Sequence, residues 1–119
     1  MQKSILITGC SSGIGLDCAE TLHAMGWKVF ASCRKQADCD RLEAMGLTSP
    51  RLDHADAASI RDTIEQVTQA TGGTLDAVFN NGAFAVPGAV EDLPTDALRA
   101  IYETNVFGYH EVIRQVLPI

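Results

Sequence analysis

The sequence predicts one α/β domain in which helices cover both faces of a parallel sheet. Short apolar runs, such as Ser4–Thr8 and Leu75–Asn80, alternate along the chain with segments whose apolar residues recur at helical spacing. Continuous apolar runs are typical of strands covered on both faces, and strands that alternate with helices form right-handed βαβ units. The 119 residues suffice for one domain, 1–119, and not for two.

The first half of the chain is expected to contain three strands and two helices. The strands are predicted at 4–8, 28–33 and 51–53. The first helix follows the glycines near the N-terminus, and its expected apolar face consists of Ile14, Cys18, Leu22 and Met25. The second helix is shorter and covers 37–45. Gly26 and Gly46 follow these helices where a left-handed cap residue belongs.

The second half begins with a helix for which Asp56 has the character of an N-cap. Gly72-Gly73 ends this helix, and a fourth strand is predicted at 75–80. The remaining segments are expected to be a loop and two helices, at 81–93, 95–104 and 107–117. The whole pattern predicts a doubly wound, Rossmann-type parallel sheet with strand order 3-2-1-4, truncated after its fourth strand.

Charge and composition exclude several classes of protein. The net charge of −6 argues against a nucleic-acid surface, and no apolar run is long enough to span a membrane. The N-terminal apolar stretch is too short for a signal peptide, so we expect a cytoplasmic protein. The four cysteines, at 10, 18, 33 and 39, form no Cys-x-x-Cys pair and lie at no metal-ligand spacing, which indicates reduced thiols and no metal site.

The segment Thr8-Gly-Cys-Ser-Ser-Gly-Ile-Gly15 lies between the first strand and the first helix. Free N–H groups and the positive end of the helix dipole make this an anion site, and glycine lets the backbone approach a phosphate closely. Two other phosphate loops do not fit the spacing. A P-loop needs a lysine, and none lies between Lys3 and Lys28; the motif Gly-x-Gly-x-x-Gly would need glycine where Cys18 stands.

This loop resembles the Thr-Gly-x-x-x-Gly-x-Gly fingerprint of the short-chain dehydrogenase/reductase family, matched by Thr8, Gly9, Gly13, Ile14 and Gly15. Three further segments resemble family motifs in the same order, so the resemblance extends over the whole chain. They are 52–56 (the adenine-binding segment), 80–83 (the Asn-Asn-Ala-Gly motif) and 103–118 (the helix with the family's structural and catalytic asparagine, here Asn105). In the second of these, Gly82-Ala83 stands where the family has Ala-Gly, and Ala83 would be strained if that position requires a positive φ.

The resemblance implies a nicotinamide dinucleotide as cofactor. Residues 9–15 would hold its pyrophosphate, Asp53 and the backbone of His54 its adenine, and residues 81–83 would line its ribose side. The expected cofactor-binding residues are Gly9, Ser11, Ser12, Gly13, Ile14, Gly15, Arg34, Lys35, Asp53, His54, Asn81, Gly82 and Ala83. For Asp53, a helix-capping role is the alternative interpretation.

The end of the second strand favours NADP(H) over NAD(H). An acidic residue there would bind the 2′-hydroxyl of the adenosine ribose and repel a 2′-phosphate, but the matching position holds Cys33. Arg34 and Lys35 follow at once, and a guanidinium can bind phosphate oxygens with two parallel hydrogen bonds. Ser11 and Ser12 could add hydroxyls. The alternative is that Arg34 and Lys35 merely begin a solvated helix.

The family's proton donor, a tyrosine in a Tyr-x-x-x-Lys motif, has no counterpart in this sequence. No lysine follows Lys35, and Tyr102 and Tyr109 have Val106 and Ile113 at the lysine position, so both are interpreted as packing residues. We therefore expect a cofactor half of a longer, homo-oligomeric enzyme, inactive alone. The complete enzyme would transfer hydride between the nicotinamide and a small-molecule carbonyl or secondary alcohol, with Asn105 in its catalytic set.

Two alternative functions rest on the same residues. A stand-alone, non-catalytic dinucleotide-binding module stays open, because it needs the glycine loop and no tyrosine. A flavodoxin-like or response-regulator domain is disfavoured, since the latter binds Mg²⁺ with carboxylates at strand ends and the first strand ends in Thr8. A truncated sheet is also expected to leave the edge of its fourth strand and part of its last helix uncovered.

Overall fold

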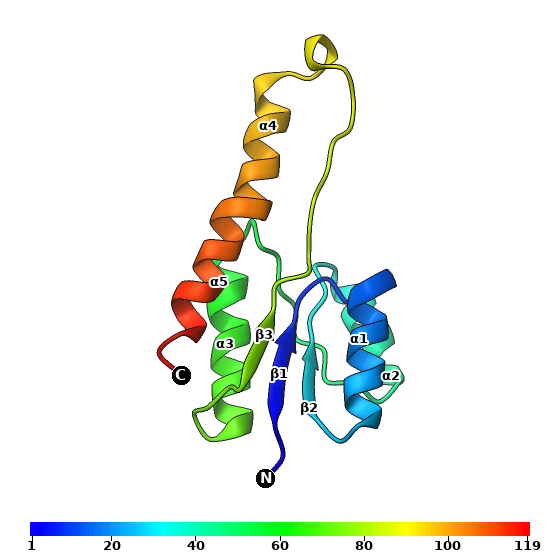
Figure 1. Ribbon diagram of the computed structural model, residues 1–119, viewed down its shortest axis with the longest axis vertical. Coiled ribbons are helices and arrows are strands. Elements are labelled where there is room, and N and C mark those ends of the chain that lie inside the picture. Colours follow the sequence, from blue (N-terminus) through cyan, green and yellow to red (C-terminus); the bar gives the residue numbers. More distant parts are fainter.

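Three parallel strands form the sheet, in the order β2-β1-β3 (Figure 1). They are β1 (Ser4–Ile7), β2 (Lys28–Ala31) and β3 (Ala77–Phe79). Leu6 of the central strand pairs with Phe30 of β2 and Val78 of β3. The computed structural model describes residues 1–119, and its parallel α/β architecture agrees with the predicted Rossmann-type sheet.

Helices cover the sheet on both faces (Figure 1). α1 (Gly13–Ala24) and α2 (Gln36–Ala44) lie on one face, and α3 (Ala57–Thr71) and α5 (Tyr109–Val116) on the other. Because side chains alternate along a strand, Ile5 and Ile7 pack toward α1 and α2, whereas Leu6 packs toward α3 and α5. The continuous apolar run near the N-terminus therefore fills two separate cores.

The face that α1 turns to the sheet differs from the predicted one. Cys18 and Leu22 pack against the core as expected, but Ile14 and Met25 are 73% and 68% exposed. The fully covered residues of this helix are Gly15 and Ala19. The apolar face is shifted because the backbone at the start of α1 packs against the segment that follows β1. Gly15 therefore faces the sheet and Ile14 faces solvent.

The prediction of a third strand at 51–53 is wrong, and the sheet has three strands instead of the predicted four. Thr48 and Arg51 form only isolated parallel bridges, with Phe30 and Cys33 of the β2 segment. The segment thus lies beside β2, where the order 3-2-1-4 would put it. Pro50 between the bridges has no N–H for a ladder, and the Arg51 carbonyl accepts from Thr63 Oγ1 at 2.7 Å instead.

The two helices expected at 95–104 and 107–117 are one continuous rod. α4 (Thr95–Tyr102) runs through a π-helical turn, Glu103–Gly108, into α5. Within the predicted loop, a short 3₁₀ turn forms at Val90–Asp92. Figure 1 shows the loop and α4 projecting from one end of the sheet, and the rod returning beside α3.

Two caps bound α3 as the sequence predicts. Asp56 Oδ1 accepts from the backbone N–H groups of Ala58 and Ser59, at 3.1 and 3.3 Å. Gly72 ends the helix in the left-handed region, at φ 77°. An amphipathic helix fixed at both ends holds the segment before it in place, and that segment contributes to the site described below.

The edge of the sheet and the end of the rod carry partly exposed apolar surface. β3 is an edge strand, and all three of its residues are half-buried. Ile113 and Leu117 are 42% and 77% exposed. Both exposures agree with the sequence-based expectation. None of the helices combines the length and the apolar character that crossing a membrane requires.

Candidate functional site

A cavity of about 450 Å³ lies where the three strands end at their carboxyl edge. Each strand leads into one of its walls: Gly9 follows β1, Arg34 follows β2 and Asn81 follows β3. Ligand sites of α/β sheets occur at this edge, and the volume is that of a small-molecule pocket. The lining residues are Gly9, Ser11, Ser12, Arg34, Leu52, Asp53, His54, Asn81, Gly82, Ala83, Phe84, Ala85 and Thr104.

The three glycines of the loop serve different purposes. Gly9 has φ +68°, and a Cβ added to it would lie 2.5 Å from the Gly82 Cα. A Cβ on Gly15 would overlap the Gly9 carbonyl. Gly13, at φ +61°, has no atom near its Cβ position, so that side of the loop is open. Two glycines therefore allow backbone to pack on backbone, and the third faces open space.

The N-terminus of α1 has no side-chain cap and no acidic residue. Its N-cap residue Ser12 makes no side-chain capping bond, and the first turn contains no acidic residue. The N–H groups of a first helical turn have no partner within the helix, and the helix dipole is positive there. Ser11 and Ser12 line the cavity beside this turn.

A threonine at the end of β1 fixes the turn that follows β3. The buried Thr8 Oγ1 accepts from the N–H groups of Asn81 and Gly82, at 3.0 and 2.9 Å. The Asn81 amide in turn donates to the carbonyls of Thr8 and Gly9, both at 3.2 Å. No residue other than glycine has a positive φ, so Ala83 is unstrained and the exchanged Gly82-Ala83 pair distorts nothing at that position.

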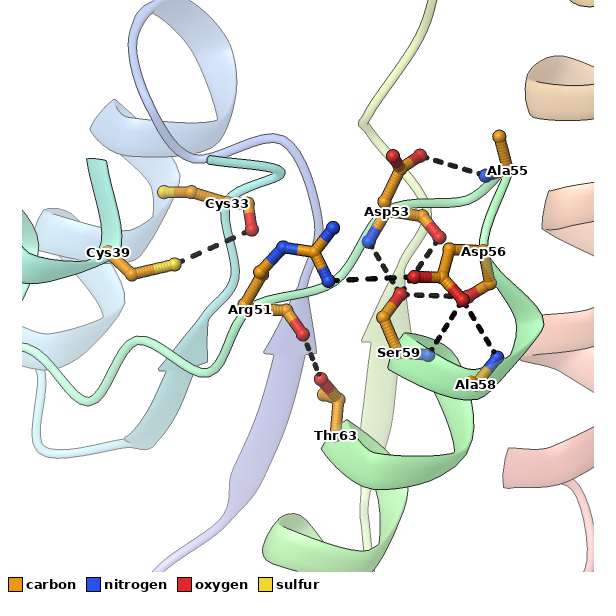
Figure 2. A network of polar contacts seen from close by, with 9 residues as sticks. All are labelled: Cys33, Cys39, Arg51, Asp53, Ala55, Asp56, Ala58, Ser59 and Thr63. Atoms are coloured by element: carbon orange, nitrogen blue, oxygen red, sulfur yellow. Dashed lines mark hydrogen bonds and ion pairs between the residues drawn. The ribbon is translucent and has the colours of Figure 1, made fainter. Parts of the chain in front are cut away.

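The wall formed by 51–56 is held by a polar network (Figure 2). Asp53 N donates to Ser59 Oγ at 3.0 Å, and Asp53 Oδ1 accepts from Ala55 N at 2.9 Å. Because Asp56 is the N-cap of α3, Asp53 closes a local turn rather than capping the helix, and it still lines the cavity. The backbone N–H of His54 has no acceptor within the chain.

The end of β2 presents one cation and no carboxylate to the cavity. Arg34 is exposed and lines it, whereas Lys35 lies outside, at the N-cap of α2. Cys33 is fully buried and accepts a weak hydrogen bond from Ser49, and burial raises the pKa of its thiol to about 11. Asp53 is the one acidic residue in the lining.

Asn105 supports the cavity from outside it. Its Oδ1 accepts from Phe84 N at 3.0 Å, and its Nδ2 donates to Phe84 O at 2.8 Å. This pair of bonds fixes the extended backbone after the β3 turn to the π-helical turn of the rod. Its neighbour Thr104 lines the cavity, but Asn105 itself does not.

The cavity brings together nine of the residues singled out from the sequence: Gly9, Ser11, Ser12, Arg34, Asp53, His54, Asn81, Gly82 and Ala83. It leaves out Gly13, Ile14, Gly15, Lys35 and Asn105. The lining residues that sequence reasoning missed are Phe84, Ala85 and Thr104; Leu52 lies in the predicted adenine-binding segment, 52–56. Their residue types carry no signal of binding, although Phe84 directly follows the Asn80–Ala83 motif and Thr104 precedes Asn105.

Other candidate groups take structural positions. The Tyr109 ring lies 4.9 Å from the His54 ring, and burial raises the pKa of its phenol, while Tyr102 is exposed. The four cysteines are free thiols, and burial also raises the pKa of Cys10. A raised thiol pKa leaves little reactive thiolate at neutral pH. No cluster of histidine, cysteine and carboxylate side chains could hold a metal ion.

Comparison with known proteins gives a family model, described as short chain dehydrogenase, that matches residues 3–119. The chain is 37% identical over 118 residues to an uncharacterized oxidoreductase, YbbO, of Escherichia coli K12, covering 99% of this chain and 44% of that protein. It is 32% identical over 108 residues to an NADPH-dependent 1-acyldihydroxyacetone phosphate reductase of Schizosaccharomyces pombe, covering 90% of this chain and 36% of that protein.

Solved structures agree with this match. An NADPH-bound carbonyl reductase from chicken fatty liver superposes with a TM-score of 0.89 at 26% identity, over 98% of this chain and 51% of that one. A 3-ketoacyl-(acyl-carrier-protein) reductase from Brucella melitensis, in complex with NADH, gives 0.88 at 25% identity, over 98% and 49%. The chain thus spans about half the length, or less, of the proteins it matches. With its glycine loop, its cavity and these matches taken together, the chain belongs to the short-chain dehydrogenase family.

Proposed function

We propose that this chain is the cofactor-binding half of an NADP(H)-dependent short-chain oxidoreductase. One observation carries the proposal. Segments that follow all three strands meet in a single cavity, which is lined by the first part of the glycine loop (Gly9, Ser11 and Ser12), an arginine and one carboxylate. A dinucleotide needs such a site, because its phosphates, its ribose and its adenine must each meet a different wall.

The phosphates would lie at the N-terminus of α1. The uncapped first turn and the hydroxyls of Ser11 and Ser12 offer hydrogen-bond donors, and the open side of Gly13 lets a phosphate approach the backbone. These donors need no counter-charge from a lysine, which agrees with a loop that contains none.

Arg34 would select NADP(H). It is the cation of the cavity lining, and no carboxylate at the end of β2 opposes a 2′-phosphate. A guanidinium–phosphate pair is among the stronger hydrogen-bonded contacts. Lys35 would contribute long-range attraction only, because it lies outside the cavity. The solved structures do not decide between NADP(H) and NAD(H), since one of those named contains NADPH and the other NADH.

The adenine would lie against 52–54. Asp53 keeps one carboxylate oxygen free of the local turn, and the His54 N–H lacks an acceptor, so adjacent residues of the segment offer one acceptor and one donor. An adenine edge presents the complementary pair, an amino group next to a ring nitrogen. Residues 81–83 would close the ribose side, held there by Thr8.

When bound, the cofactor would supply the hydride that passes between its nicotinamide and a carbonyl or secondary alcohol. This chain's own share is binding and orientation, because neither of its tyrosines is followed by the lysine of the family motif. Asn105 would act by fixing the Phe84 backbone at the cavity and by shaping the rod. The substrate, and assembly into a homo-oligomer, would depend on the complete protein.

The proposal is tested by titrating the purified 119-residue chain with NADPH and with NADH while nicotinamide fluorescence is followed. We expect saturable binding of NADPH that is tighter than that of NADH. Binding of neither nucleotide by a folded sample would remove the proposal. A non-catalytic dinucleotide-binding module would bind equally well, and the two functions are separated by whether the gene encodes a Tyr-x-x-x-Lys segment after Ile119.

A further inference from the structure

His54 is a buried polar residue at the junction of three segments. Only 7% of it is exposed, and it lies between the turn after β3 and the start of α5. A Cβ on Gly108 of the rod would overlap the His54 carbonyl, and the Tyr109 ring stacks at an angle of 44° on the imidazole. The expected adenine contact uses only the backbone of His54, so it does not explain the side chain.

The hydrogen bonds around the ring define its tautomer. Asn80 Nδ2 donates to the Tyr109 carbonyl at 3.4 Å, which leaves Asn80 Oδ1 as the acceptor. His54 Nε2 lies 3.1 Å from that oxygen and is therefore the donor. The neutral ring then carries no proton on Nδ1. Through this bond the imidazole holds the side chain of Asn80, the residue from which the cavity turn starts.

Space, and not backbone conformation, requires glycine at position 82. Gly82 is absent from the set of glycines with positive φ. A Cβ there would lie 2.8 Å from His54 Cε1, 3.1 Å from His54 Nδ1 and 3.3 Å from Gly9 N. Tyr109 packs against the ring and Asn80 holds its Nε2, so a shift of the ring would disturb both contacts. A methyl group at 82 would therefore displace either the imidazole or the glycine loop.

We infer that His54 is a positioning residue of the cavity and that Gly82 is glycine to admit its ring, an inference that rests on the proposed function. The imidazole binds the side chain of Asn80, while Thr8 binds the backbone N–H groups of the two residues that follow. The exchanged Gly82-Ala83 pair and the histidine are then one feature of the sequence: a large side chain at 54 matched by the loss of a methyl group at 82.

A double-mutant cycle tests the pairing. Gly82→Ala is expected to weaken NADPH binding about tenfold or more, and the same change in a His54→Ala background is expected to weaken it much less. The double variant should bind more tightly than Gly82→Ala alone. His54→Gln, which keeps an N–H donor for Asn80, should bind NADPH more tightly than His54→Ala. As the matched control, His110→Ala, at an exposed histidine, should not rescue Gly82→Ala.

Three results overturn the inference. Equal losses from Gly82→Ala in both backgrounds would remove the pairing, and ¹⁵N resonances of the free protein showing the Nδ1–H tautomer of His54 would remove the bond to Asn80. If Gly82→Ala does not fold, thermal unfolding replaces affinity: a folded double variant supports the pairing and an unfolded one overturns it. Wild-type chain that binds no NADPH would overturn the proposed function as well, whereas binding with additive losses overturns the pairing alone.

Discussion

Thr8 holds Gly82 across the sheet: its hydroxyl, buried at the end of β1, accepts the Gly82 N–H at 2.9 Å. The same oxygen accepts from Asn81, so one side chain satisfies two backbone donors that belong to another strand's turn. The contact joins residues 74 apart in sequence. It makes the cavity depend on a residue that would contact no ligand.

Thr8→Val keeps the shape of this side chain and removes the acceptor. The Gly82 N–H would then lack a partner, whereas the Asn81 N–H would keep the Phe79 carbonyl at 3.0 Å, and we expect the free energy of unfolding to fall by about 1–3 kcal/mol. NADPH affinity should fall with it, because the turn at 81–83 loses its support. Urea unfolding followed by circular dichroism measures the first effect. Thr8→Ser, which keeps the hydroxyl, is the control; equal stability of Thr8→Val and wild type would contradict the role of this oxygen.

Arg34→Ala should separate the two nicotinamide cofactors. Loss of a charge-assisted contact is expected to weaken NADPH binding about tenfold or more, while NADH binding changes little. Lys35→Ala should have the smaller effect, since Lys35 lies outside the cavity. Fluorescence titration of both variants with both nucleotides gives the comparison. Equal losses for NADPH and NADH in Arg34→Ala would mean that the arginine does not meet a 2′-phosphate.

The sequence predicts the centre of the sheet better than its margins, for a physical reason. β1, β2 and β3 are apolar runs whose signal is local. The expected strand at 51–53 fails because Pro50 interrupts the ladder and Thr63, on a later helix, binds the Arg51 carbonyl. The hydrophobic periodicity of the sequence does not indicate that contact. A local pattern likewise could not show that α4 and α5 are joined by the π-helical turn.

The site, like the sheet, has parts that the sequence predicts and parts that it does not. The glycine loop could be predicted because turn geometry and helix dipoles are properties of adjacent residues. Phe84 and Thr104 could not, since they come together at the cavity through contacts distant in sequence, such as the two hydrogen bonds of Asn105 to the Phe84 backbone. The match between His54 and Gly82 is visible only after folding, although the exchanged motif at 82–83 was a sign of it.

Gly13→Val should separate binding from folding. The side chain would enter open space at φ +61°, so we expect a loss of stability of about 1–2 kcal/mol from backbone strain, together with loss of NADPH binding. Gly46→Val is the matched control, because Gly46 has φ +91°, equally open surroundings and no part in the cavity. It should show at least as much strain, because φ +91° lies further outside the allowed left-handed region, and unchanged affinity.

Gly15→Ala should instead impair folding, since its Cβ would overlap the Gly9 carbonyl. Thermal unfolding and NADPH titration of the three variants decide the matter; retained binding in Gly13→Val would place the phosphates elsewhere.

His54 should make the protein less stable in mild acid. Burial lowers its pKa below the ordinary 6.5, although the bond to Asn80 and the charge of Asp53 both act to raise it. Glu103 and Glu111 line a neighbouring hollow with His54, and Tyr109 covers its ring.

Between the folded and unfolded pKa values of His54 the unfolded chain binds more protons than the folded one. The free energy of unfolding is therefore fully retained above pH 6.5 and falls as the pH drops toward the folded pKa. Urea unfolding at about pH 7.5 and about pH 5.5 measures this slope. His54→Gln should flatten it, because His23 and His110 are exposed and remain in both proteins. The same slope in wild type and variant would mean that the imidazole gains its proton as easily in the folded chain as in the unfolded one.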